Sequence, residues 1–229
     1  MIGLIPVENT DPLPAVRGFL RQLLETGLVE AVYVPLEMDG NAVVPALVVD
    51  PEQLAHANPL APAMSINGAR AVSALTGKHA PTPIAAVLRP CELRALIELV
   101  KLQQASLEDV TIISLDCPGT YEWTNFIDAQ RSGTLDLPGY LEAGSKGSAT
   151  GLRAACQMCT HPMPEHVQIH LRLFGADLTQ GIPVYIEDGI ADLLEMVEVQ
   201  EFRDRERQAV IDSLIAQRQQ TRQKELDAT

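Results

Sequence analysis

The stretch PIAAVLRPCELRALIELVKLQQ (residues 83–104) and the later VTIISLDCPG (residues 110–119) decide the fold class. The first begins with a short apolar run that predicts a buried strand. The rest of that stretch carries apolar residues at helical spacing, namely Leu93, Leu96, Ile97 and Val100. VTIISLDCPG is a second buried strand that ends at a turn. A strand, a helix and a strand in this order predict parallel strands in an α/β layer.

The residues before this centre predict a helix and a hairpin. A helix is expected over about residues 15–26, ended by Gly27, and the run VEAVYVP (29–35) has the character of a strand. Asp-Gly then stands between it and a second apolar run at residues 42–50, which is a hairpin signal. Pro45 inside the second run favours an edge strand or a bulge.

The remaining segments complete the expected fold. Residues 65–77 predict a helix, residues 121–151 are polar and glycine-rich and suggest a loop, and residues 182–188 predict a short strand. From about residue 191 the chain has helical character, with apolar residues on one face and charges on the other. The predicted class is therefore α/β, a mixed sheet with a parallel strand–helix–strand centre, an N-terminal hairpin and a C-terminal amphipathic helix.

Two domains follow from this division. Residues 1–190 are expected to form the α/β domain, and residues 191–229 a helical extension that contacts a partner.

Composition narrows the functional classes. The 229 residues carry a formal net charge of −13, which argues against nucleic-acid binding because phosphate contacts need clustered Lys and Arg. No apolar run reaches the length of about 18 residues that a membrane span requires. The start lacks the pattern of a secretory signal, so we expect a cytoplasmic protein, in which thiols stay reduced.

The four cysteines, Cys91, Cys117, Cys156 and Cys159, have the spacing C-x25-C-x38-C-x2-C. In a cytosolic chain, four thiols indicate a metal site. Cys91 and Cys117 each follow a predicted parallel strand, and the carboxyl ends of such strands lie on one edge of a sheet. The pair in CQMC is a chelating loop that can close over the same point.

Three interpretations of the cysteines remain open at this stage. A 4Fe-4S cluster needs four thiolates, and Arg89, Arg94 and Arg153 lie close in sequence to offset its negative charge. Structural zinc also accepts four thiolates, although its ligands usually come from two close pairs. Finally, Cys91 and Cys117 can be buried small apolar residues without a metal.

Three segments resemble a known family: VLRPCELRALIELVKLQQ, IISLDCPGTYE and RAACQMCTHPMPEHVQI. They are similar to the beta subunits of coenzyme F-420-dependent hydrogenases and formate dehydrogenases. The resemblance runs from about residue 59 to residue 188, and it implies that Cys91, Cys117, Cys156 and Cys159 are the ligands of one 4Fe-4S cluster. It also implies a bound FAD that exchanges a hydride with the deazaflavin and passes electrons singly to the cluster.

A flavin needs backbone N–H groups or cations for its pyrophosphate. The best candidates lie at the expected start of the 65–77 helix, namely Ser65, Asn67, Gly68 and Arg70. Lys78 and Arg89 follow them as further candidates. Ser65 and Asn67 can equally be simple helix caps, and the cations can be solvated surface charges. A GxGxxG motif is absent from the sequence, so a Rossmann dinucleotide site is not expected.

These observations predict an electron-transfer subunit of a multi-subunit oxidoreductase, of the hydrogenase, formate dehydrogenase or heterodisulfide-reductase-like kind. The expected partners are other redox subunits. The alternative is a structural adaptor with a zinc site, in which the C-terminal helix docks a partner. His166 and His170 lack the HExxH pattern and are interpreted as an ordinary surface pair.

Overall fold

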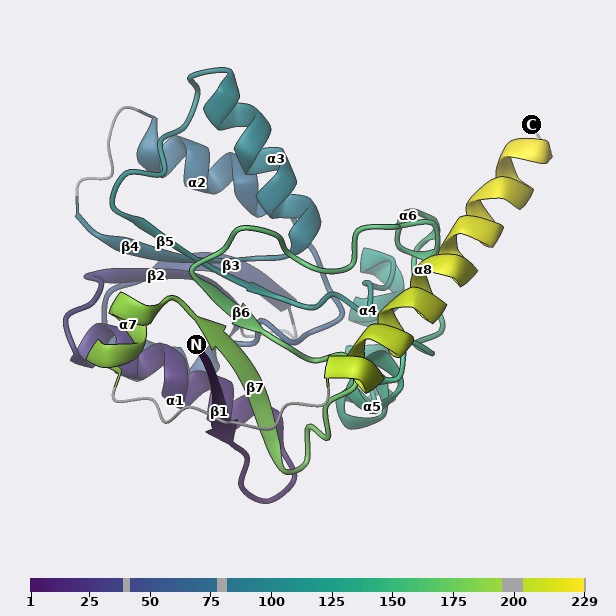
Figure 1. Ribbon diagram of the computed structural model, residues 1–229, viewed down its shortest axis with the longest axis horizontal. Coiled ribbons are helices and arrows are strands. Elements are labelled where there is room, and N and C mark those ends of the chain that lie inside the picture. The colour runs from purple at the N-terminus through teal and green to yellow at the C-terminus, as the bar shows by residue number, and fades with distance from the viewer. Residues whose placement is uncertain (39–41, 78–81, 195–203, 229) are drawn as a thin grey trace.

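The computed structural model describes residues 1–38, 42–77, 82–194 and 204–228, and within these ranges a seven-stranded sheet forms the centre of the molecule (Figure 1). The strands are β1 (Ile2–Pro6), β2 (Ala31–Met38), β3 (Ala42–Val48), β4 (Ile84–Leu88), β5 (Val110–Leu115), β6 (Ile169–Leu171) and β7 (Gly181–Ile186). The helices are α1 (Pro12–Glu25), the short 3-10 helix η1 (Pro51–His56), α2 (Gly68–Thr76), α3 (Pro90–Lys101), α4 (Trp123–Arg131), α5 (Leu137–Ser145), α6 (Ala154–Gln157), α7 (Asp188–Leu193) and α8 (Asp204–Asp227).

The sheet is parallel at its centre and antiparallel at both edges. Its strand order is β1-β7-β6-β5-β4-β2-β3, in which β2, β4, β5 and β6 run parallel. β3 pairs antiparallel with β2, while β7 pairs antiparallel with both β6 and β1. The predicted α/β class, the parallel centre and the N-terminal hairpin are therefore confirmed.

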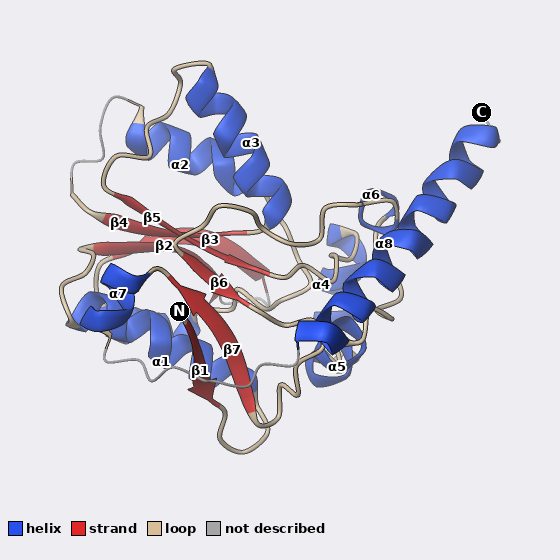
Figure 2. Ribbon diagram, in the orientation of Figure 1, coloured by secondary structure: helices blue, strands red, loops and turns tan. Residues whose placement is uncertain are grey.

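Helices cover both faces of the sheet (Figure 2). In β4, Ala85 and Val87 belong to the apolar core on the α1 side, whereas Ile84, Ala86 and Leu88 belong to the core beneath α2 and α3. A central strand buried on both faces has no polar side, which explains its uninterrupted apolar sequence. The helices α4, α5, α6 and α8 gather at the end of the sheet where the parallel strands finish (Figure 1).

The hairpin of β2 and β3 lies at one edge of the sheet. Pro45 stands opposite Pro35 within it, and β3 is the outermost strand, as predicted from the proline. The predicted Asp-Gly turn falls on residues 39–41, which lie outside the described residues.

The prediction of a loop over residues 121–151 is wrong, since α4 and α5 lie there. Phe126 on α4 is fully buried, and the Asp136 side chain caps α5 by accepting a hydrogen bond from the Gly139 N–H at 2.9 Å. Each helix has only nine residues, and α5 contains a proline and two glycines, so the helical pattern in the sequence is weak.

Two further differences concern the N-terminal part. The strand β1 was not expected, and it exists by pairing with β7 from the far end of the sequence. Helix α1 begins at Pro12 rather than at residue 15, because Asp11 caps it with a 3.0 Å hydrogen bond from the Leu13 N–H.

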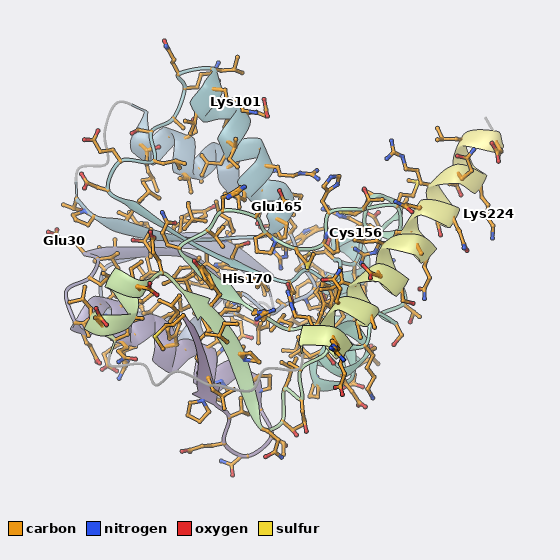
Figure 3. All side chains as sticks on the ribbon, in the orientation of Figure 1. Glu30, Lys101, Cys156, Glu165, His170 and Lys224 are labelled. Carbon is orange, nitrogen blue, oxygen red and sulfur yellow. The ribbon has the colours of Figure 1, made fainter. Side chains whose placement is uncertain are left out.

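The C-terminal helix α8 packs one stripe of side chains against the rest of the chain. Its buried residues recur at helical spacing: Arg207, Ile211, Leu214 and Arg218. The ten residues after Arg218 are mostly exposed, and Lys224 points away from the molecule in Figure 3. Among the described helices, none is long and apolar enough to cross a membrane.

Gly68 at the start of α2 provides a test of packing against the sheet. A Cβ at this position would lie 2.7 Å from Leu88 Cδ2 and 3.2 Å from a ring carbon of Tyr33. We expect Gly68→Ala to lower the free energy of unfolding by about 1–3 kcal/mol through overpacking. Gly18→Ala is the matched control, because this exposed helical glycine has nothing within 4 Å of the added Cβ. Denaturant unfolding should show Gly18→Ala neutral or stabilised, and equal losses in both variants would contradict the packing argument.

Candidate metal centre

The four cysteines come together from three separate segments. Cys91 is the second residue of α3, directly after β4, and Cys117 lies just beyond the end of β5. Cys156 is in the short helix α6, with Cys159 three residues further along the chain. All four are partly buried and line one cavity of about 360 Å³. The predicted convergence of the cysteines at the sheet edge is thus what the structure shows.

Backbone hydrogen bonds fix the cysteine segments to one another. The Cys117 N–H donates to the Pro162 carbonyl oxygen at 2.7 Å, which ties the loop after β5 to the segment after Cys159. The Arg153 N–H donates to the Thr120 carbonyl oxygen at 2.9 Å, on the other side of the same loop. The two loops are therefore held together whether or not a metal is bound.

Gly119 allows the loop after Cys117 to pass close to Cys156. Its φ angle is +123°, which side chains rarely adopt, and a Cβ there would lie 2.6 Å from Leu152 Cδ1 and 3.2 Å from Cys156 Cβ. The Tyr140 hydroxyl donates a 2.6 Å hydrogen bond to the Gly119 carbonyl oxygen from the buried side. Glycine is therefore required at this position on steric grounds.

The thiols differ in how readily they ionise. Burial raises the pKa of the Cys117 thiol to about 12, and burial also raises the pKa of Cys91. Cys156 behaves differently: burial opposes ionisation, but hydrogen bonds from Thr120 and Arg153 outweigh it and lower its pKa. Negative charge on Cys156 further raises the pKa of Cys91 and of Cys117, so the cysteines are close enough to repel one another as thiolates. Metal ions bound to the sulfurs would remove that repulsion.

Hydrogen bonds and cations surround the cavity. The Thr120 N–H and Arg153 Nε each donate to Cys156 Sγ at 3.3 Å, and Cys156 lies beside α8 in the view of Figure 3. Four arginines line the cavity: Arg94, Arg153, Arg218 and Arg222. The sequence had suggested Arg94 and Arg153 as compensating charges, but it gave no indication of the two on α8.

Asp116 supports the cysteine loop, and sequence reasoning missed it. It directly precedes Cys117 and is completely buried, and its carboxylate accepts hydrogen bonds from Arg207 of α8 and from the Phe174 N–H. Burial alone would raise its pKa, but the hydrogen bonds of Arg207 and His170 lower it to about 2. An Asp before Cys-Pro-Gly has the appearance of a turn residue, and its partner lies 91 residues away, so no local signal identifies the pair.

His170 corrects the interpretation of the histidines. It lies in strand β6, where its Nε2 is 2.8 Å from Asp116 Oδ1, and its side chain is only 14% exposed (Figure 3). His166 is exposed, with a φ angle of +54°. The two therefore do not form a surface pair on one helix.

Glu92 organises the start of both α2 and α3. It is buried, its Oε1 accepts from the Gly68 N–H at 2.7 Å, and its Oε2 accepts from the Arg89 N–H at 2.9 Å. One carboxylate thus satisfies an otherwise unpaired amide at each helix N-terminus. Because Glu92 follows Cys91 directly, this contact also sets where that cysteine stands.

The candidate flavin residues lie near one another but are largely engaged already. Gly68 N–H is bound by Glu92, and the Asn67 side chain caps α2 by accepting from the Ala69 N–H at 3.0 Å. Arg89 is buried and donates to the Ala61 carbonyl oxygen at 2.6 Å, whereas Arg70 is exposed. Lys78 lies outside the described residues.

Tyr33, Ser65 and Arg89 line a small cavity of about 20 Å³. The hydroxyls of Ser65 and Tyr33 are buried and have no hydrogen-bond partner among the described residues. A cavity of that size holds about one water molecule. These residues, as arranged, do not fit a flavin dinucleotide, so the flavin assignment stays a prediction.

The donor set fits a cluster better than it fits a single ion. Four thiolates around one zinc ion stand about 2.3 Å from the metal and leave no cavity between them. Among the described residues, which include all four cysteines, no three His, Cys, Asp or Glu side chains are arranged to hold one metal ion. Cysteines spread around a cavity of about 360 Å³, with hydrogen-bond donors and cations in its wall, suit a larger anionic group such as a 4Fe-4S cluster.

Comparison with solved structures shows a likeness in fold. The chain matches no model of a known protein family. Among solved structures, it is similar to a chain in a xenon-derivatised structure of the F420-reducing NiFe hydrogenase complex from Methanosarcina barkeri, with a TM-score of 0.63 and 13% sequence identity. The similarity covers 96% of this chain and 90% of that chain, so the two share nearly the whole fold.

Glu92 provides a test of how the site is supported. We expect Glu92→Gln to lower the free energy of unfolding by about 1–3 kcal/mol, because one of the two accepting oxygens becomes an NH2 group that faces a backbone N–H. Glu98→Gln is the control, since it lies on the same helix in an exposed pair with Lys101 and should change stability by less than about 1 kcal/mol. Thermal unfolding of the metal-free proteins measures both, and an unchanged melting temperature for Glu92→Gln would refute this role.

Proposed function

We propose that this chain is an electron-transfer subunit of a multi-subunit oxidoreductase, in which Cys91, Cys117, Cys156 and Cys159 hold one 4Fe-4S cluster. The observation that carries the proposal is the convergence of all four cysteines, from three segments, on one cavity lined by arginines. Such a cluster, when bound, supplies reversible one-electron transfer.

The protein residues prepare the cavity for an anionic, redox-active group. Thr120 and Arg153 donate hydrogen bonds to Cys156 Sγ, and such bonds to cluster sulfurs stabilise the added electron. The hydrogen bond from Tyr140 to Gly119 keeps the loop after Cys117 against the protein interior. Together these contacts orient the thiolates before the cluster binds.

The fold likeness supports the assembly part of the proposal. The similar chain belongs to an F420-reducing hydrogenase complex, and we propose that this chain likewise works among other redox subunits of a hydrogenase, formate dehydrogenase or related complex. In that arrangement electrons pass between a flavin, on this chain or on a neighbour, and the clusters of the partners. FAD enters the proposal through the family resemblance, since the candidate residues at the start of α2 do not fit it as arranged.

A zinc-bound structural adaptor is the rival function. The spacing of the cysteines speaks against it, because structural zinc usually takes its thiolates from two close pairs, whereas only Cys156 and Cys159 form a close pair here. In addition, one side of helix α8 packs against this chain and is not available to a partner, since Arg207, Ile211, Leu214 and Arg218 are buried.

Purification without oxygen tests the proposal directly. We expect a brown protein with about four iron and four sulfide per chain, whose absorbance bleaches with dithionite and whose reduced form gives an EPR signal. Flavin analysis of the same sample decides whether FAD is bound to this chain. A colourless protein that contains zinc, without iron or sulfide, would rule out the electron-transfer function.

Substitution of one cysteine tests the ligand set. We expect Cys117→Ser to lose most of the iron and sulfide, because the cluster needs all four thiolates and serine is a poor replacement. Met158→Leu is the control: it lies between Cys156 and Cys159 in the cavity wall and should retain the metal. Iron content equal to that of the wild type in Cys117→Ser would exclude Cys117 as a ligand.

A further inference from the structure

Two arginines of α8 reach the cavity of the cysteines. Arg218 is only 4% exposed, and its guanidinium donates to the Pro118 carbonyl oxygen at 2.5 Å and to the Cys159 carbonyl oxygen at 3.3 Å. Since Pro118 follows Cys117, one side chain joins the loops of two different cysteines. Arg222, one helical turn further on, lines the same cavity.

The position of Arg218 is fixed by the packing of the whole first part of α8. At the other end of the buried stripe, Arg207 binds the buried Asp116 carboxylate. Between the two arginines, Ile211 and Leu214 pack against Phe174 in a small apolar cluster. The helix runs alongside the end of the sheet in Figure 1, and α6, which carries Cys156, contacts it. These contacts hold α8 in place, and the helix thereby positions Arg218 beside the two carbonyl oxygens.

The positive charge of these arginines affects the reduction potential of any redox group in the cavity. Reduction adds one electron, and hence one negative charge, to the group that the thiolates hold. A cation beside the group, in a partly buried site of reduced dielectric, stabilises the reduced form and makes the reduction potential less negative. Arg218 and Arg222 add two such cations to Arg94 and Arg153.

We propose that α8 is part of the redox centre: Arg218 clamps the loops of Cys117 and Cys159 together, and Arg218 and Arg222 raise the reduction potential of the cluster. Arg218 acts as a positioning residue, because it binds backbone carbonyl oxygens rather than sulfur. The effect of the arginines on the reduction potential rests on the proposed function, whereas the hydrogen bonds of the clamp are present in the metal-free chain.

Hydrogen exchange of the metal-free protein tests the clamp. The reporters are the amides of Cys117 and Thr120, which bind Pro162 and Cys156 across the two loops. We expect these amides to exchange about tenfold faster in Arg218→Gln, the factor that corresponds to a loss of about 1.4 kcal/mol from the hydrogen bonds of the guanidinium. Arg205→Gln is the matched control, because Arg205 is exposed on the same helix and is not among the described residues of the cavity wall. Equal exchange in both variants would overturn the clamp.

A redox titration of the cluster-loaded protein tests the charges. Dithionite reduces each cluster by one electron and is itself oxidised to sulfite, and the EPR signal of the reduced cluster, recorded at a series of fixed potentials, gives the midpoint potential. We expect Arg222→Gln and Arg218→Gln to shift the midpoint to more negative potential, while Arg205→Gln leaves it in place. Arg218→Lys keeps the charge but loses the planar fork, so it should retain the potential and show faster exchange at Cys117.

Two outcomes of this titration would count against the proposal. Midpoints of Arg218→Gln and Arg222→Gln that equal that of Arg205→Gln would overturn the electrostatic role. A wild-type chain that takes up no iron and sulfide would overturn that role together with the proposed function, whereas the exchange measurement would still decide the clamp by itself.

Discussion

The buried carboxylate of Asp116 is the interaction on which the rest of the structure depends. Asp116 lies between strand β5 and Cys117. Its carboxylate is hydrogen-bonded to Arg207 of α8, His170 of β6 and the Phe174 N–H. An ion pair without solvent access stabilises a protein only when every partner is present, and removal of one partner typically costs about 3–5 kcal/mol. The end of the sheet, the following loop and the C-terminal helix therefore form as one unit, and the loop of Cys117 is part of it.

The centre of the fold could be predicted from the sequence because its signals are local. The apolar run of β4, the helical spacing in α3 and the second apolar run in β5 each reveal their structure within a few residues. Parallel neighbours then place Cys91 and Cys117 at the same sheet edge by geometry alone. The convergence of the cysteines was predictable for this reason, and the structure brings Cys156 and Cys159 to the same cavity.

The support of the site could not be predicted, because its partners are distant or polar. Glu92 meets the Gly68 amide across 24 residues, and Arg218 meets Pro118 across 100. The buried stripe of α8 begins and ends with arginine, so apolar periodicity marks only its middle. The predicted flavin site differs, because there the sequence suggests a site that the contacts do not leave free. Residues of suitable type lie together, but Glu92 and Asn67 already accept hydrogen bonds from the backbone amides that a pyrophosphate would need.

The reach of Arg218 across 100 residues has a consequence for the order of events during synthesis. A ribosome releases the chain from its N-terminus, so β2, β4 and β5 can pair before the later cysteines have emerged. The loop of Cys117 receives Arg207 and Arg218 only when α8 has been made. The cavity therefore reaches its final shape only after α8 has been synthesised and has packed, so a cluster of the kind proposed would enter a site that the folded chain has already shaped.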